Sequence, residues 1–127
     1  MPGVKDLITD LHNRGTKLIL ASSAARRKID KVFTRFGLYS YFDEVISGED
    51  FEFFKPHPAI FLEAVEKSGF DKTECIIIED STNGIQAAKA AGVYCIAYVS
   101  GHGLPQDTSG ADKVITDFIE FNINAAT

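Results

Sequence analysis

The sequence predicts an α/β protein in which helices cover both faces of a mostly parallel β-sheet. Short apolar runs typical of strands alternate along the chain with segments whose apolar residues recur at helical spacing. Such alternation favours parallel strands joined by helices, packed in three layers. Polar residues also gather where two apolar runs end, at Ser22 and at Glu79 and Asp80. Ligands of parallel sheets bind at the carboxyl ends of the strands, so this pattern predicts a site there.

The size and charge of the chain fit a single globular domain over residues 1–127. The chain has 127 residues, of which 45% are hydrophobic and 24% are charged, and its net charge is −5. The acidic balance argues against nucleic acid or an anionic membrane as the main partner. No apolar run approaches the ~20 residues of a membrane span, and the N-terminus lacks a signal-peptide core. We therefore expect a cytoplasmic protein with no nucleic-acid and no membrane partner.

The first four elements follow from apolar spacing and from the glycines that end the helices. Residues 4–14 place their apolar side chains on one helical face and stop at a glycine. Residues 17–22 form a short apolar run that predicts a buried strand. Residues 24–36 predict a second amphipathic helix, again closed by a glycine, and residues 42–47 predict a short strand.

The remaining elements repeat this alternation. Residues 58–68 begin with a proline suited to the first helical turn and predict a helix that ends at a glycine. Residues 75–79 are a strand, and capping residues followed by a helical pattern predict a helix over 83–91. Residues 93–99 and 113–116 predict the last two strands.

Both cysteines, Cys75 and Cys95, stand beside apolar, strand-like runs. Neither a Cys-x-x-Cys spacing nor a histidine cluster accompanies them. We therefore expect buried, reduced thiols of the kind found in cytosolic proteins, in preference to a disulfide or a metal pair.

The first polar cluster ends the strand expected at 17–22. Ser22 and Ser23 follow the apolar run, and a helix begins soon after them. A serine hydroxyl and the free N–H groups at a helix start make a site for an anion. Taken alone, the pattern fits a pair of helix-capping serines that bind no ligand better than it fits an anion site.

The second cluster is Lys55, which precedes a proline in the loop expected over 48–58. A lysine held there could reach a phosphate as a point charge. Alone it fits a solvated surface lysine better. His57 lies in the same loop and is interpreted as a loop residue, not a ligand.

The third cluster is the run of Glu79, Asp80 and Ser81. Adjacent carboxylates at the edge of a core need a partner, and a cation is one candidate. Two carboxylates suit Mg²⁺, which keeps water and phosphate oxygens for its other positions. The alternative is that Asp80 or Ser81 only caps the helix that follows.

The order of the three clusters resembles motifs II, III and IV of the haloacid dehalogenase superfamily. The segments "KPHPAIFLEAVEKSG" and "IIIEDSTNGIQAAKAAG" are similar to its β-phosphoglucomutase and phosphoglycolate phosphatase branch almost residue by residue. The segment "PGVKDLITDLHNRGTKLILAS" resembles the stretch that follows the helical cap in those proteins. The resemblance covers nearly the whole chain and implies a Rossmann-like αβα core.

The resemblance implies a role for each phosphate-binding residue. Ser22 would bind the transferring phosphate through its hydroxyl, with help from backbone N–H groups around Ser23 and Ala24. Lys55 would neutralise the phosphate and the nucleophilic carboxylate. Arg26 lies where some relatives touch substrate, and we assign it no role.

The resemblance also implies a magnesium cofactor and a substrate class. Asp80 would be a ligand of Mg²⁺, and Glu79 would be a second ligand or would hold the water around the ion. The substrate would be a small phosphorylated metabolite, and the reaction a phosphatase or phosphotransferase reaction.

The aspartate nucleophile of the family has no counterpart in this chain. Asp6 and Asp10 lie on a helical pattern, and Asp50 and Glu52 lie in the loop before Lys55. None of these acids follows an apolar strand, so none is suited to form an aspartyl-phosphate intermediate. We therefore expect the isolated chain to be inactive.

The family's nucleophile strand would lie between the strands expected at 17–21 and 75–79. Its absence would leave a gap of two strand spacings, each ~4.8 Å, with unpaired backbone groups on both sides. Three alternatives follow from this gap. The chain is the C-terminal part of a longer protein, the two flanking strands pair directly, or a partner chain, including a second copy, fills the gap.

Two rival interpretations stay open. The chain could be a non-catalytic module that binds an anion or a partner and keeps a remnant of the family signature. A receiver domain shares the residue types, but receivers place the acidic pair early and the lysine last, whereas Lys55 here precedes Glu79 and Asp80.

Overall fold

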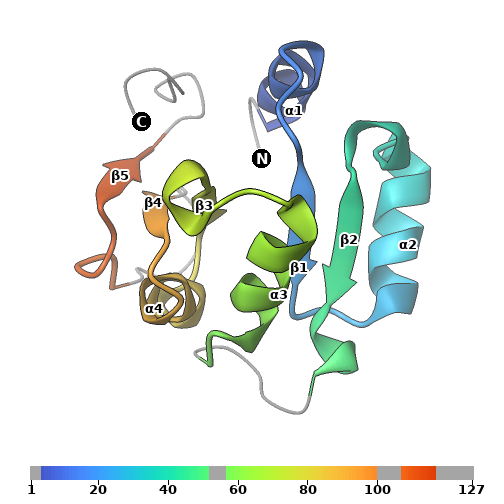
Figure 1. The fold of residues 1–127 in the computed structure, drawn as a ribbon. Helices are drawn as coiled ribbons and strands as arrows, with labels where there is room; N and C mark the ends of the chain where they lie inside the picture. The colour runs from blue at the N-terminus through green and yellow to red at the C-terminus, as the bar shows by residue number, and fades with distance from the viewer. Residues whose placement is uncertain (1–3, 52–56, 100–106, 117–127) are drawn as a thin grey trace.

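The computed structural model describes residues 4–51, 57–99 and 107–116. The first half of the chain forms two helices and a pair of strands (Figure 1). They are α1 (Val4–Asn13), β1 (Ile19–Ser22), α2 (Arg26–Phe36) and β2 (Glu44–Ser47). The strands β1 and β2 are parallel, and Ser22 stands opposite Ser47 at their carboxyl ends.

The second half forms a three-stranded parallel sheet in the order β3-β4-β5. Its elements are α3 (Ala59–Ser68), β3 (Ile76–Glu79), α4 (Thr82–Ala90), β4 (Tyr94–Tyr98) and β5 (Lys113–Ile115). Each predicted helix and strand is present, and its ends lie within two residues of the prediction. The short tail from residue 117 onward lies outside the described residues.

Within the described residues, three short 3-10 helices were not predicted, because each spans a single turn and is too short to show a periodic pattern. They are η1 (Tyr39–Tyr41), η2 (Gly48–Asp50) and η3 (Lys72–Glu74). The expected position of Pro58 in the first turn of its helix is also wrong. Pro58 is the N-cap residue of α3 and not part of its first turn.

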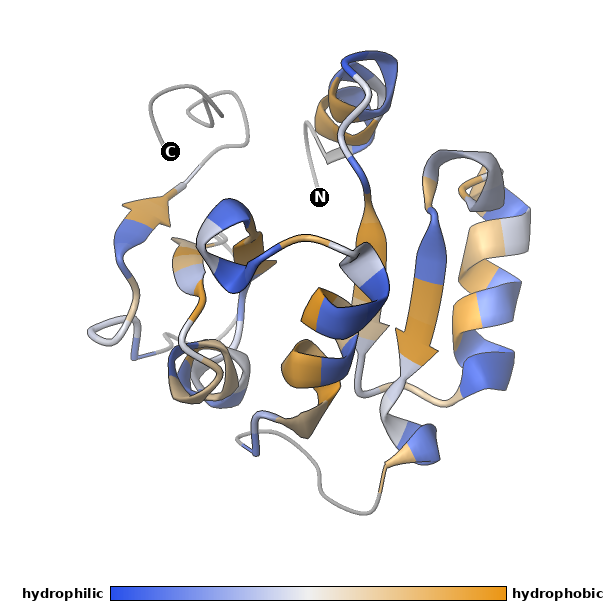
Figure 2. Ribbon diagram, in the orientation of Figure 1, coloured by the Kyte–Doolittle hydropathy of each residue, from blue (hydrophilic) through white to orange (hydrophobic). Residues whose placement is uncertain are grey.

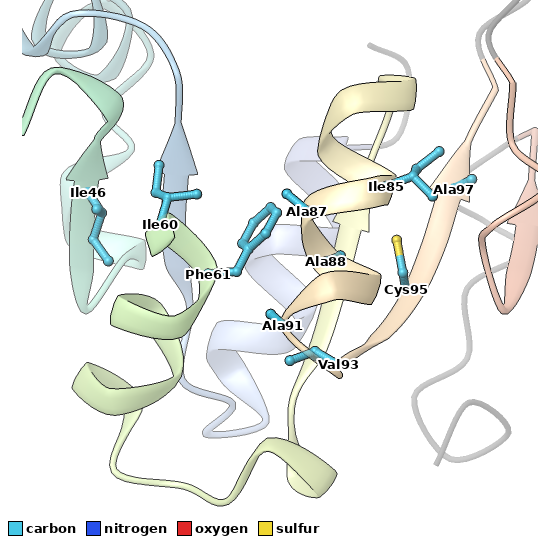
Figure 3. Close-up of a cluster of buried hydrophobic side chains, with 10 residues drawn as sticks. All are labelled: Ile46, Ile60, Phe61, Ile85, Ala87, Ala88, Ala91, Val93, Cys95 and Ala97. Carbon is cyan, nitrogen blue, oxygen red and sulfur yellow. The ribbon is translucent and has the colours of Figure 1, made fainter. Parts of the chain in front are cut away.

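Helices α3 and α4 cover one face of the strands, and their contact with the strands forms the main core (Figure 3). This core consists of Ile46, Ile60, Phe61, Ile85, Ala87, Ala88, Ala91, Val93, Cys95 and Ala97. Because side chains alternate along a strand, Ile96 and Tyr98 of β4 point to the other face, where Leu7 of α1 packs against them. Helix α2 lies on the opposite side of the β1–β2 pair from α3 (Figure 1).

These layers confirm the predicted α/β class with parallel strands. Figure 2 shows the corresponding pattern, in which the strands are apolar and polar residues gather on the outer faces of the helices. Helix ends also follow the prediction. Gly37 ends α2 in the left-handed region at φ 63°, and its N–H donates to the carbonyls of Phe33 and Thr34.

The strands form two separate sheets, β1–β2 and β3–β4–β5. Within the described residues β1 and β3 do not pair, so the alternative in which the flanking strands pair directly is wrong. An open groove of about 1220 Å³ lies between them, lined mostly by apolar side chains of α1, β1, α3 and β3. The remaining alternatives both place another segment of chain in this groove.

Candidate active site

The first part of the site is the loop that follows β1, which we call the anion loop (Ser22–Arg26). The N–H of Ala24 donates to Ser22 Oγ over 3.1 Å, which leaves the hydroxyl hydrogen of Ser22 available to donate. The N-cap residue of α2 is Ala25, which makes no side-chain capping bond. The alternative interpretation, in which Ser22 and Ser23 serve only to cap α2, is therefore wrong.

The start of α2 already holds a carboxylate. The N–H of Arg26 donates to Glu49 Oε1 over 3.1 Å, as expected for the partly positive end of a helix. The guanidinium of Arg26 makes two hydrogen bonds with the Asp50 carboxylate. This contact holds the pKa of Asp50 below its usual range. Arg26 is therefore engaged by the segment after β2.

The second part of the site is the carboxyl end of β3. Glu79 Oε1 accepts hydrogen bonds from the Asp80 N–H and from Ser81 Oγ, each over 3.2 Å. Ser81 is the N-cap residue of α4, and its Oγ accepts the Gly84 N–H over 3.0 Å. Capping therefore explains Ser81, and the carboxylate of Asp80 is exposed and accessible to a cation.

The side chain of Glu79 lies directly against the first turn of α4. A Cβ atom placed on Gly84 would lie 2.0 Å from Cδ of Glu79 and 2.4 Å from its Oε2. Only a glycine at this position lets the carboxylate keep its place beside the helix. The position of Glu79 is thus set by the helix that follows it.

The groove brings the two parts together. Ser22, Ser23 and Ala24 line it from the end of β1, and Glu79 and Asp80 line it from the end of β3. The structure therefore gathers all the predicted site residues that it describes around one opening. Lys55 lies outside the described residues.

The donors at the end of β3 suit a magnesium ion. Glu79 and Asp80 offer adjacent hard oxygen ligands, and Mg²⁺ usually takes one or two carboxylates and completes its shell with water and phosphate oxygens. The part of the chain that the structure describes contains no group of three or more His, Cys, Asp or Glu side chains able to hold a metal. At the Glu79–Asp80 pair, Mg²⁺ would take water and phosphate oxygens as its other ligands.

Sequence reasoning missed Ser47 and Gly48, which lie against the anion loop. Ser47 is fully buried, and its Oγ donates to the Ala24 carbonyl over 2.6 Å. A signal was available, because Ser47 ends an apolar strand in the same way as Ser22. Residues at the ends of neighbouring parallel strands lie side by side, so the two serines could have been paired.

The two cysteines are free thiols, as predicted. Cys95 is fully buried on β4, and burial raises its pKa to about 11. Cys75, just before β3, is only half-buried, so the expectation of a buried thiol is wrong at this position. In the described part of the chain, no helix has the length and apolar character needed to cross a membrane.

The sequence profile of the haloacid dehalogenase-like hydrolases matches residues 1–98 of the chain. The chain is 44% identical over 97 residues to Protein SUPPRESSOR OF QUENCHING 1, chloroplastic, of Arabidopsis thaliana, covering 76% of this chain and 9% of that protein. It is 37% identical to Hexitol phosphatase B of Escherichia coli K12, covering 72% of this chain and 41% of the enzyme. It is 30% identical to the Phosphoglycolate phosphatase of Pseudomonas putida, covering 91% and 43%. The chain thus spans less than half the length of these three proteins.

Solved structures agree with the fold. CbbY from Rhodobacter sphaeroides in complex with phosphate superposes with a TM-score of 0.86 at 29% identity, covering 94% of this chain and 54% of that one. A β-phosphoglucomutase from Clostridium difficile superposes with a TM-score of 0.83 at 24% identity, covering 98% and 53%, and supports the fold alone. The branch predicted from the sequence motifs is confirmed by these comparisons.

Proposed function

Since the chain belongs to the haloacid dehalogenase-like hydrolase family, we propose that it is the larger part of the catalytic core of a Mg²⁺-dependent phosphatase or phosphotransferase that acts on small phosphorylated metabolites. The observation that carries this proposal is the shared groove. It is lined from one side by the anion loop and from the other by Glu79 and Asp80. An anion site facing a pair of carboxylates is the arrangement that a phosphate ester and a divalent cation need.

The residues of the anion loop would hold the phosphoryl group. Ser22 Oγ accepts the Ala24 N–H, so the hydroxyl hydrogen of Ser22 would be available to donate to a phosphate oxygen. The backbone N–H of Ser23 would add a second donor within the anion loop. Lys55 would bring a positive charge from the loop after β2. These donors would stabilise the charge that builds up on the transferring group.

The carboxylates of Asp80 and Glu79 would hold Mg²⁺, with Asp80 as ligand and Glu79 as ligand or as partner of its water. When bound, the ion would neutralise phosphate charge and orient the group for in-line attack. Glu79 is held in place by Ser81 and by the Asp80 N–H, so its carboxylate is positioned before any cation arrives. Such preorganisation lowers the cost of binding.

The nucleophile would come from a strand in the groove. Two of the acids considered from the sequence are engaged elsewhere. Asp10 of α1 pairs with Arg14, just beyond the end of that helix, and Asp50 pairs with Arg26. An additional parallel strand between β1 and β3 would join the two sheets and would end beside both parts of the site. We propose that this strand carries the aspartate and that the 127-residue chain without it turns over no substrate.

The test compares the 127-residue chain with the same chain extended by its in-frame upstream coding sequence. We expect no hydrolysis of p-nitrophenyl phosphate by the shorter protein, and Mg²⁺-dependent hydrolysis by the longer one if that sequence contains an Asp-x-Asp after an apolar run. Asp80→Asn in the longer protein should lower kcat at least about 100-fold, because a metal ligand is lost. Wild-type activity in Asp80→Asn would contradict the metal assignment. Phosphate binding without turnover in both proteins would favour a non-catalytic anion-binding module.

A further inference from the structure

We infer that the segment after β2, which we call the brace (Ser47–Asp50), positions the anion loop, and that Ser47 is its central positioning residue. This inference rests on the proposed function, because it concerns how the anion loop is held in the shape that binds phosphate. Nothing in the brace touches the ligand under this proposal. Its role is to set the direction of backbone groups that do.

The hydroxyl of Ser47 is the main contact between the two segments. Ser47 has no exposed surface, and its Oγ donates to the Ala24 carbonyl over 2.6 Å and accepts the Glu49 N–H over 3.2 Å. Ala24 is also held through its other backbone group, because its N–H donates to Ser22 Oγ. The peptide groups before and after the Ala24 Cα are therefore both held by serine hydroxyls from the ends of neighbouring strands.

The backbone of the brace lies in contact with the anion loop. A Cβ atom on Gly48 would lie 3.0 Å from the Ser23 Cα, 3.3 Å from the Ser23 carbonyl oxygen and 3.4 Å from that of Ser22. The neighbours are backbone atoms, so they cannot move aside as a flexible side chain would. A side chain at position 48 would therefore force the anion loop to shift by a few tenths of an ångström, so this contact sets how closely the two loops approach.

The outer contacts of the brace are weaker. Glu49 accepts the Arg26 N–H over 3.1 Å, and Asp50 pairs with the Arg26 guanidinium. The side chains of the Arg26–Asp50 pair are 54% and 41% exposed, and exposed ion pairs contribute little to stability. A buried hydroxyl bonded at both its donor and its acceptor site costs more to lose. Ser47 and Gly48 are accordingly the residues on which the loop geometry depends.

The structure offers a matched control at the other end of the groove. Ser68 is also a buried serine, its Oγ donates to the Val65 carbonyl over 2.6 Å, and it accepts the Phe70 N–H over 3.0 Å. Like Ser47, it donates to a backbone carbonyl and accepts the N–H two residues further on, although its carbonyl partner lies in its own helix and its Oγ also lies 3.8 Å from Cys75 Sγ. The backbone carbonyl of Ser68 accepts a hydrogen bond from Lys17 Nζ. Lys17 precedes the amino end of β1, whereas the anion loop follows the carboxyl end of the same strand. Removing either hydroxyl should cost similar stability, but only Ser47 should affect an anion at Ser22.

The experiment is a titration of the ¹⁵N-labelled 127-residue chain with inorganic phosphate in the presence of Mg²⁺, followed by the amide signals of Ser23 and Ala24. In Ser47→Ala we expect the dissociation constant of phosphate to rise about tenfold, the effect of losing one well-made buried hydrogen bond. In Ser68→Ala it should change less than about twofold, since the hydroxyl lies far from the ligand. Gly48→Ala keeps every hydroxyl but displaces the loop, and it should weaken binding at least as much as Ser47→Ala.

Amide hydrogen exchange without phosphate gives an independent measurement. Ser47→Ala should raise the exchange rate at Ala24 and Arg26 above the general increase that Ser68→Ala produces. Equal phosphate affinity in wild type, Ser47→Ala and Gly48→Ala would overturn the inference that the brace positions the anion loop, and it would leave the proposed function standing. Equal weakening in Ser47→Ala and Ser68→Ala would also overturn it, because the effect would then be one of stability alone. If phosphate caused no shift at Ser23 or Ala24 in the wild type, the anion site itself, and with it the proposed function, would fail.

Discussion

Strands β3 and β4 are neighbours with similar apolar sequences and very different surroundings. In β4 the residues from Cys95 to Tyr98 are buried, with exposed fractions of at most 6%, because the strand pairs on both sides. In β3 three consecutive isoleucines are only half-buried, because the strand pairs on one side and faces the groove on the other. A continuous apolar run is typical of an interior strand of a parallel sheet. The sequence of β3 therefore fits an interior position that the described chain leaves at an edge.

The same contrast applies to β1. All four of its residues are half-buried, and it pairs only with β2. Open apolar edges are normally covered or charged in native proteins, since unpaired backbone groups there invite association. The closed part of the molecule, around β4, therefore carries its stability, and the open part, around β1 and β3, carries the candidate site.

The largest expected effect tests this contrast directly. Ile78 of β3 stands opposite Ile96 of β4, so the two isoleucines form a matched pair. Ile96→Ala should lower the free energy of unfolding by about 3 kcal/mol, because Ile96 is fully buried, whereas Ile78→Ala should cost about 1.5 kcal/mol. Urea unfolding followed by circular dichroism measures both values.

A strand placed in the groove should reduce the difference between the stability costs of Ile78→Ala and Ile96→Ala. In a longer protein whose added strand fills the groove, Ile78→Ala should cost about as much as Ile96→Ala, because both side chains would then be enclosed. Equal costs already in the 127-residue chain would show that β3 is not an open edge.

The second prediction uses the thiols of the two regions. Burial raises the pKa of Cys95 to about 11, above its value in the unfolded chain. The folded state therefore holds this proton after the unfolded state has lost it, and the free energy of unfolding should fall by up to about 2 kcal/mol as the pH rises from 9 to 11. Cys95→Ala should remove most of this slope in pH-dependent urea titrations, and Cys75→Ala should keep it.

Thiol labelling provides the control. At pH 8 the folded chain should react with an aromatic disulfide reagent at Cys75, which is half-buried, and Cys95 should react only after unfolding. Cys75→Ala should therefore abolish labelling of the folded chain. Rapid labelling of Cys95 would mean that β4 opens as readily as the edge of β3.

The smallest expected effect concerns the end of β3. Gly84→Ala improves helix propensity by about 1 kcal/mol but places a methyl group on the Glu79 carboxylate. The glutamate side chain can rotate away, and the loss of its contacts should offset the gain in helix propensity, so the net change in the free energy of unfolding should be close to zero. In the Glu79→Ala background, where no carboxylate is displaced, the full gain in helix propensity should appear. Urea unfolding of the four proteins of this double-mutant cycle measures the coupling between Glu79 and Gly84, which we expect to be about 1 kcal/mol.

A coupling close to zero would mean that Glu79 does not rest against α4 in solution. Mg²⁺ titration of Gly84→Ala gives a second readout, since a displaced Glu79 should weaken binding of the ion even where stability is unchanged.

Much of the site could be predicted from local patterns. Ser22, Glu79 and Asp80 each end an apolar run, and parallel strands bring such ends to one edge. Gly84 was seen only as part of a motif, because the reason for it is the side chain of Glu79, which approaches it in space. The place of Ser47 at a strand end could have paired it with Ser22, but its bond to the Ala24 carbonyl could not be predicted, because the sequence does not indicate which carbonyl a strand-end serine meets.

The sequence by itself determined the order, type and approximate limits of the helices and strands, because apolar spacing and glycine or proline positions act within a few residues of the chain. Only the tertiary structure decided how the strands are distributed between two sheets, which isoleucines are enclosed and which line a groove. It also decided that Ser47 and Gly48 lie beneath the anion loop. These outcomes depend on contacts between segments far apart in the chain, and pairing and burial are properties of those contacts and not of any one segment.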